Sequence, residues 1–485
     1  MKQPSITPES FARYAGANVP RYTSYPTAPA FSPAVSEDIY REWLGAIPAG
    51  TDVSVYVHVP FCRAMCLYCG CHTTVTVRDE PIERDLGAHE REIDLAAKAM
   101  PAGLPLRHLH FGGGSPTLVP PRRMLALMHR LKSHFAFAPD AEIAIEVDPR
   151  TLSGELAAAL GRAGFNRASI GVQSFDPAVQ RAINRVQSFD ETEAAIASLR
   201  QSGIARINLD LIYGLPHQTV DSCRATVEQA LEFAPDRFAV FGYAHVPAFK
   251  KHQRRIDGAT LPGMEERLAQ SQAIAASLRD AGFAEIGLDH YARADDPMAE
   301  AWRAGTLHRN FQGYTTDAAE ALIGFGYSAI GHLPQGYVQN TVVISDYLKR
   351  VAEGRLPVAR GYALCEEDRV RAAVIERIMC DRQVDLAAVC GRFGWEPERI
   401  EDRAYLDTLA LHGLIERIPG THRYVLTADG IRVAVFYNKV HARVLRPLVA
   451  APDQPPAPIE LRRALGTIDR VVANYADNAR LAPAA

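Results

Sequence analysis

The sequence has few cysteines, few tryptophans and no long hydrophobic run. Eight cysteines and three tryptophans occur in 485 residues, too few cysteines for a scaffold held together by disulfides. No segment approaches the roughly 20 consecutive apolar residues that span a bilayer, and Met1–Ala17 lacks the apolar stretch of a signal peptide. We therefore expect a cytoplasmic protein with no membrane partner.

Charge of one sign is also scarce. The formal net charge is −3, and the lysines and arginines form no block that would bind a phosphate backbone, so we expect no nucleic-acid partner. Hydrophobic residues make up 47% of the chain and charged residues 22%, without repeats or low-complexity tracts. This composition is typical of a globular protein, and the length allows about two to four domains.

Short β-rich runs alternate with segments whose apolar residues have helical spacing. Such alternation predicts β-α units in a parallel sheet, and we expect a barrel-like α/β domain over 51–350. The β-rich runs are 53–59, 108–111, 142–147, 167–173, 206–213, 237–243 and 284–291.

Five of these runs end in residues suited to chemistry. Because the carboxyl ends of parallel strands meet on one face of such folds, we expect these features to converge there. They are the cysteine loop after 53–59, Gly112–Gly114, Glu146 with Asp148, Gln173, and Gly214–Pro216.

The regions that flank the barrel differ from it. Residues 1–50 contain Pro20–Thr27, where prolines disfavour helix, and we predict an extended arm there. Residues 360–485 show mainly helical patterns, with a possible strand pair around Ile415–Val425 and a last helix over Glu460–Tyr475. We predict a separate, mainly helical C-terminal cap domain.

Four cysteines, at positions 62, 66, 69 and 71, fall within ten residues directly after a predicted strand. Such a group can bind an iron-sulfur cluster, close a zinc tetrahedron, or consist of small buried side chains without a metal. Structural zinc usually needs a second Cys/His pair, and none of that type follows. The local chemistry therefore favours an iron-sulfur cluster, but a zinc site and a group of cysteines without a metal stay open.

The spacing C-x3-C-x2-C of Cys62, Cys66 and Cys69 resembles the signature of the radical S-adenosylmethionine (SAM) superfamily. The resemblance implies one 4Fe-4S cluster whose three thiolate ligands leave one iron open for SAM. The loop Gly112–Thr117 supports it, because glycines expose backbone groups at close range to a zwitterionic ligand. It also implies a partial (β/α)6-type, TIM-like barrel.

A closer resemblance covers nearly the whole chain and points to the oxygen-independent coproporphyrinogen III oxidase family. It implies the oxidative decarboxylation of two propionates to vinyls, from coproporphyrinogen III to protoporphyrinogen IX, in haem biosynthesis. The matching segments are Pro20–Thr27, Val57–Cys71, GGGSPT at 112–117, Ile145–Pro149, Gly171–Gln173, Asn208–Pro216 and His308–Thr316.

The resemblance also implies two SAM molecules and assigns residues to each. Tyr56, Gly113, Glu146 and Ile330 would hold the SAM on the cluster, and we count Tyr56 and Glu146, with the three cysteines, among the catalytic residues. The second SAM would be held by Tyr68, Gly114, Ser115, Gln173, Arg185, Asp210 and Ala244. For each charged residue the alternative is a structural ion pair.

The mechanism that the resemblance implies begins with a 5'-deoxyadenosyl radical that takes a hydrogen from the propionate β-carbon. An electron then passes to an unidentified acceptor and CO2 leaves. Four propionates need cationic partners, for which Arg21 and Arg309 are the candidates, against the alternative of solvent-facing charge. We expect an electron donor such as flavodoxin or ferredoxin, and a monomer.

Two rival functions remain within the same superfamily. A haem chaperone keeps the cluster motif but typically lacks the arm and a cysteine at the place of Cys71, both of which are present. A methyltransferase or cyclopropanase shares the two-SAM architecture. We predict that Cys71 is not a ligand, because a fourth thiolate would close the open iron, and we assign no metal to His58, His108 or His110.

Overall fold

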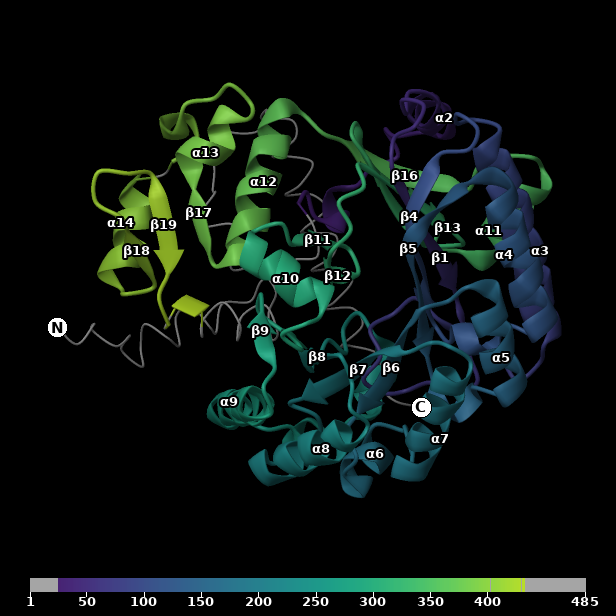
Figure 1. Cartoon of the computed structure of the whole chain (residues 1–485), viewed down its shortest axis with the longest axis horizontal. Helices are drawn as coiled ribbons and strands as arrows, with labels where there is room; N and C mark the ends of the chain where they lie inside the picture. Colours follow the sequence, from purple (N-terminus) through teal and green to yellow (C-terminus); the bar gives the residue numbers. More distant parts are fainter. Residues whose placement is uncertain (1–24, 402, 429, 432–485) are drawn as a thin grey trace, which may run out of the picture.

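The chain folds around one large open sheet, with helices packed along its outside (Figure 1). The computed structural model describes residues 25–401, 403–428 and 430–431. Arg21, residues 1–24 of the expected arm and the expected helix Glu460–Tyr475 lie outside the described residues. The rest of the arm, 25–50, is not extended throughout, because it contains helix α2 (Glu37–Gly45). Among the helices of the described part, none combines the length and apolar character that a membrane crossing requires.

Six parallel strands form the centre of the sheet, in the order β1-β4-β5-β6-β7-β8. Each contains or closely matches one of the first six runs predicted from the sequence, so the α/β fold with a partial (β/α)6-type barrel is confirmed. The strands are β1 (Val53–Val59), β4 (Pro105–Gly113), β5 (Ala136–Val147), β6 (Arg167–Gln173), β7 (Arg206–Tyr213) and β8 (Arg237–Gly242).

Helices connect these strands and begin at caps that the sequence supplies. The Ser153 side chain accepts the Leu156 N–H at the start of α5, and Ser188 forms a capping box with Glu191 at the start of α7. Gly164 ends α5 with a φ of 98°. The helices are α3 (Glu80–Ala97), α4 (Pro121–His134), α5 (Gly154–Ala163), α6 (Pro177–Ala182), α7 (Phe189–Gln201), α8 (Val220–Glu232) and α9 (Met264–Asp280).

Side chains alternate along the central strands and separate an apolar layer from a polar one. One set of alternate residues is buried in the main core: Val53, Val55, Val57 and Val59 on β1, Ile143, Ile145 and Val147 on β5, and Ile207, Leu209 and Leu211 on β7. The residues between them point to the opposite face, because successive side chains of a strand alternate. Tyr56, Glu146 and Asp210 therefore share that second face.

Further strands extend the sheet at both edges. Next to β1 lie β13 (Ala321–Phe325), β14 (Ile330–Leu333), β15 (Gly336–Asn340) and β16 (Val358–Ala363). The sheet therefore continues past residue 350, where we placed the end of the barrel. Helices α2 (Glu37–Gly45) and α11 (Ile344–Ala352) pack near this edge.

The opposite edge corrects one prediction. The run 284–291, expected to be a single strand, forms the antiparallel pair β9 (Ala284–Ile286) and β10 (His290–Ala292). The chain reverses at Gly287, whose φ of 56° lies in the left-handed region that glycine adopts without strain. Helix α10 (Pro297–Ala304) and a hairpin of β11 (His308–Asn310) and β12 (Gly313–Thr315) follow.

The C-terminal described part has a hydrophobic core of its own, which includes Val374, Ile378 and Trp395. Its helices are α12 (Glu366–Asp381), α13 (Leu386–Gly391) and α14 (Arg403–Leu411). The expected strand pair is present as β18 (Ile415–Arg417) and β19 (Arg423–Leu426), and β17 (Gln383–Asp385), which the sequence did not indicate, completes a three-stranded sheet. The division of the chain into domains stays a prediction.

Candidate functional site

The cysteine loop leaves the carboxyl end of β1 and is held there by backbone hydrogen bonds. Short strands β2 (Phe61–Cys62) and β3 (Thr74–Val75) pair at its two ends. The glycine loop after β4 grips its start, since the Gly114 N–H donates to Val59 O and the Ser115 N–H to Phe61 O, both at 2.7 Å. The two motifs predicted to act together are therefore one structural unit.

Close packing between the glycine loop and the start of the cysteine loop explains why glycine is needed here. A Cβ on Gly114 would lie 2.6 Å from the Phe61 carbonyl oxygen, and one on Gly113 would lie 2.5 Å from the His58 ring. Gly113 also has a φ of 111°, which side chains rarely adopt. We expected the glycines to expose backbone groups to a ligand. In this structure the Gly113 N–H donates to a protein group, Glu146 Oε2, at 3.1 Å.

The thiols of Cys62, Cys66 and Cys69 suit a metal cluster better than a single ion. Among the described residues, only Glu398, Glu401 and His422 bring three ligand atoms within 4.8 Å of one another, so the three thiols are spread more widely than that. One zinc ion with Zn–S bonds of about 2.3 Å needs its sulfurs closer together. The zinc reading of the sequence therefore fits less well than a cluster with several irons.

The environment of the thiols differs from one to the next. Burial raises the pKa of Cys62 to about 11, while the Ser115 hydroxyl donates to its sulfur at 3.6 Å. A hydrogen bond from the Cys71 side chain lowers the pKa of Cys69 to about 6, and the Cys71 backbone N–H lies 3.4 Å from the same sulfur. Cys71 thus contacts a proposed ligand. Its own role stays a prediction.

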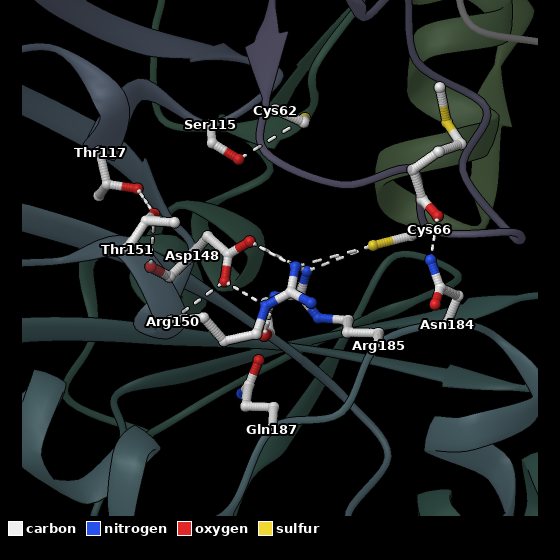
Figure 2. A network of polar contacts seen from close by, with 12 residues as sticks. Cys62, Cys66, Ser115, Thr117, Asp148, Arg150, Thr151, Asn184, Arg185 and Gln187 are labelled. Carbon is white, nitrogen blue, oxygen red and sulfur yellow. Dashed lines mark hydrogen bonds and ion pairs between the residues drawn. The ribbon is translucent and has the colours of Figure 1, made fainter. Parts of the chain in front are cut away.

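Two arginines and one carboxylate surround Cys66 (Figure 2). Arg150 Nη2 and Arg185 Nη1 each lie 3.8 Å from Cys66 Sγ. Asp148 accepts from Arg150 Nε at 2.9 Å and Nη2 at 2.7 Å, and it lies 3.4 Å from Arg185 Nη1. Arg185 is one of the residues predicted from the family resemblance. Arg150 was not predicted.

The residues predicted for the SAM on the cluster lie on neighbouring strands. Tyr56 on β1 stacks on His110 of β4 with ring centroids 6.0 Å apart, and His110 Nε2 lies 3.3 Å from Glu146 Oε1 on β5. Burial acts against the charge of Glu146, but the hydrogen bonds from His110 and Gly113 hold its pKa below the usual value. Ile330 starts β14 and adjoins Gly324, the strand partner of Tyr56.

Three residues predicted for the second SAM, Gln173, Arg185 and Asp210, lie on β6, after β6 and on β7, while Tyr68, Gly114 and Ser115 lie in the cysteine and glycine loops. Asp210 on β7 accepts from Ser169 Oγ at 3.0 Å and from Asn208 Nδ2 at 2.8 Å. Burial raises the pKa of Asp210 to about 6, and the charge of Glu146 adds to the effect. Gln173 ends β6 with a φ of 68°, and Arg185 donates to the Gly171 carbonyl at 2.7 Å.

A second segment that the sequence gave no reason to choose packs on the cysteine loop. Its Lys250, His252 and Gln253 side chains donate to the carbonyl oxygens of Cys71, Cys69 and Tyr68 at 3.1, 2.7 and 3.2 Å. Gln253 also donates to Ala244 O at 3.3 Å, which ties together Tyr68 and Ala244, both predicted for the second SAM. These contacts join residues about 180 positions apart, so local pattern does not reveal them.

The structure describes only one of the two arginines predicted to bind the substrate. Arg21 lies outside the described residues. Arg309 sits on the β11–β12 hairpin, with its guanidinium over the Tyr314 ring at 5.5 Å from the centroid. Its backbone N–H donates to Glu376 of α12 at 3.3 Å, so this hairpin joins the barrel region to the C-terminal helices.

Comparison with known proteins agrees with the geometry. The radical SAM superfamily profile matches residues 56–230. The chain is 55% identical over 423 residues to an oxygen-independent coproporphyrinogen III oxidase of Bradyrhizobium diazoefficiens, covering 87% of this chain and 92% of that one. It is 40% identical over 399 residues to the Escherichia coli protein of the same name, covering 82% and 87%.

A solved structure gives the same result. The coproporphyrinogen III oxidase of Escherichia coli, described as a radical SAM enzyme, superposes with a TM-score of 0.80 at 37% identity, over 87% of this chain and 99% of the other. The glycine-braced cysteine loop thus lies in a chain that matches such enzymes over almost their full length. The chain belongs to the family of the oxygen-independent coproporphyrinogen III oxidases.

Proposed function

We propose that this chain is a radical SAM oxidoreductase that converts coproporphyrinogen III to protoporphyrinogen IX without oxygen. Two propionate side chains lose CO2 and become vinyls, a step of haem biosynthesis. The observation that carries the proposal is the loop of Cys62, Cys66 and Cys69 at the end of β1, braced by the glycine loop, in a chain with full-length relatives of this activity.

The radical SAM superfamily implies a 4Fe-4S cluster and SAM. We assign the cluster to Cys62, Cys66 and Cys69. When bound, the reduced cluster supplies the electron that cleaves SAM. Glu146, kept ionised by His110 and Gly113, offers an anionic acceptor for the SAM amine, and Tyr56 offers an aromatic face beside it.

We also propose a second SAM on the other side of the cysteine loop. Arg185 offers a planar cation for the SAM carboxylate, and Asp210 offers an acceptor for ribose hydroxyls. Tyr68 and Ala244, joined through Gln253, would close this side. The remaining residues assigned to this molecule are Gly114, Ser115 and Gln173.

Substrate and electron partners complete the proposal. Arg21 and Arg309 would each pair with a propionate, since carboxylates bind a guanidinium through two hydrogen bonds. We infer that a flavodoxin or ferredoxin supplies the electron and that the enzyme acts as a monomer. The chain's own share of the reaction is to hold the reactants in place and to keep water from the radical.

The test is anaerobic turnover. Protein reconstituted with iron and sulfide is given SAM, a reductant and coproporphyrinogen III. The mass of the tetrapyrrole product is then measured by mass spectrometry. Loss of two CO2 is expected from the wild type and none from Cys66→Ser. Tight haem binding without CO2 loss would favour the chaperone function, and a mass gain of a methyl group would favour a methyltransferase.

A further inference from the structure

Arg150, Asp148 and Arg185 form a charged group on one side of Cys66 that no step of the proposed function uses as a unit. Arg150 lies in the 3-10 turn η3 (Pro149–Thr151), directly after β5. Its backbone N–H and its side chain both donate to Asp148, at 3.2 Å from the amide and 2.9 Å from Nε. The guanidinium is therefore held in one orientation by its near neighbour.

That orientation directs the arginine toward sulfur. Arg150 Nη2 is shared between Asp148 Oδ2 at 2.7 Å and Cys66 Sγ at 3.8 Å. Arg185 Nη1 makes the same pair of contacts, at 3.4 Å to Asp148 and 3.8 Å to Cys66. Figure 2 shows both guanidinium groups side by side, facing the Cys66 sulfur.

The surroundings strengthen the effect of these charges. Cys66 is buried, and the side chains of Asp148, Arg150 and Arg185 are only 10%, 22% and 8% exposed. Charges out of water are screened little and interact strongly over a few ångströms. Two positive groups and one negative group thus leave a net positive charge beside one of the three proposed cluster ligands.

The other two thiols have different neighbours. Cys62 Sγ accepts from the neutral Ser115 hydroxyl, and Cys69 Sγ accepts from the Cys71 backbone. Within the part of the chain described, neither of these two sulfurs contacts a guanidinium group. Lys250 and His252 act electrostatically on Cys69, but the direct contacts from guanidinium groups are made to Cys66.

We propose that the Arg150–Asp148 pair is a positioning device that sets the reduction potential of the cluster through Cys66. The inference rests on the proposed function, because it requires a 4Fe-4S cluster on Cys62, Cys66 and Cys69. Reduction adds one electron, taken from an external reductant, and moves no proton at these groups. A cation and N–H donors near a ligand sulfur favour the more negative, reduced state and raise the potential.

The direction of the shift distinguishes this role from a purely structural one. Arg150→Met removes a positive charge and should lower the midpoint potential of the cluster. Asp148→Asn removes a negative charge while its amide oxygen can still accept the Arg150 N–H, so it should raise the potential. The double variant leaves the net charge beside Cys66 unchanged, so its shift should be smaller than that of either single variant. Damage to folding would instead impair both single variants in the same way.

The experiment is an anaerobic potentiometric titration of reconstituted protein without SAM or substrate, followed by electron paramagnetic resonance. Iron and sulfide content are measured on the same samples. Arg122→Met is the matched control, because that arginine is 79% exposed and pairs with Glu83 on the outer helices. It should leave the potential unchanged. Arg150→Lys keeps the positive charge but loses the planar guanidinium with its several N–H donors. Its midpoint potential should lie between those of the wild type and Arg150→Met.

Opposite shifts for Arg150→Met and Asp148→Asn support the inference. Potentials equal to that of the wild type, or shifts of the same sign in protein with full iron content, overturn it. If Arg150→Met fails to hold iron, the sign of the Asp148→Asn shift decides alone. A wild type that holds no cluster would refute the proposed function instead, so the two failures are distinguishable.

Discussion

Glu146 and Asp210, which share the face of the sheet opposite the main core, have pKa values shifted in opposite directions. We call Tyr56, His110 and Glu146, on β1, β4 and β5, the Glu146 side. The Asp210 side consists of Ser169, Asn208 and Asp210, on β6 and β7. Burial raises both pKa values, but only Glu146 has partners that can outweigh it.

The partners explain the difference. Glu146 receives a backbone N–H from Gly113 and faces an imidazole that can carry a positive charge. Asp210 accepts from a hydroxyl and an amide, both neutral, and these bonds with the charge of His290 do not outweigh burial and the negative charge of Glu146. Two carboxylates in one barrel can thus serve different purposes, a permanent anion on one side and a titrating acceptor on the other.

The largest expected effect comes from Gly113→Ala, which disturbs the donor to Glu146. The new Cβ would meet the His58 ring at 2.5 Å in a backbone conformation with a φ of 111°. We expect a loss of about 1–3 kcal/mol of stability and of most of the iron. Urea unfolding and iron content measure it. Gly103→Ala, with a positive φ but no neighbour within 4 Å, should keep its iron.

The next effect should follow from Glu146→Gln, which removes the anion and keeps the shape. Losing a charged acceptor is worth about 1.5–3 kcal/mol, so kcat/KM for SAM should fall about 10- to 100-fold with unchanged iron content. Anaerobic kinetics measure it. Glu142→Gln, on the same strand but paired with Arg167, should leave SAM kinetics unchanged. An equal loss in both variants would contradict the assignment of Glu146.

A smaller effect is expected for Asp210→Asn and depends on pH. The wild-type carboxyl gains a proton as the pH falls through about 6 and then becomes a weaker acceptor for SAM. SAM affinity in cluster-loaded protein should therefore fall below pH 6 in the wild type. In Asp210→Asn it should be several-fold lower at pH 8 and lack this inflection. Equilibrium dialysis over pH 5–8 measures the SAM affinity of the two proteins. Identical pH profiles would contradict the assignment of Asp210 to the SAM site.

The smallest effect concerns stability. A carboxyl with a raised pKa costs folding free energy above its folded pKa of about 6, and this cost disappears below its usual 3.8. Asp210→Asn should therefore be more stable than the wild type at pH 8, with no gain near pH 4. Denaturant unfolding at the two pH values measures the gain. A gain of equal size at both would contradict the assigned cause.

The sequence predicted the parallel strands and the cysteine and glycine loops, because these depend on local periodicity and spacing. It did not predict the turn at Gly287, since one glycine inside an apolar run does not reveal a reversal. Nor did it reveal Arg150 or Gln253, whose contacts with Cys66 and Tyr68 join distant segments. Such contacts depend on how elements pack, and no local pattern encodes packing.

The most direct test is the ratio of SAM cleaved to CO2 released during anaerobic turnover of coproporphyrinogen III. Methionine, 5'-deoxyadenosine and the tetrapyrrole are quantified from the same sample. The account predicts two CO2 per protoporphyrinogen IX, with SAM cleavage and CO2 release rising together and both absent in Cys66→Ser. Formation of the vinyl product without cleavage of SAM, or SAM cleavage that never leads to loss of CO2, would contradict it.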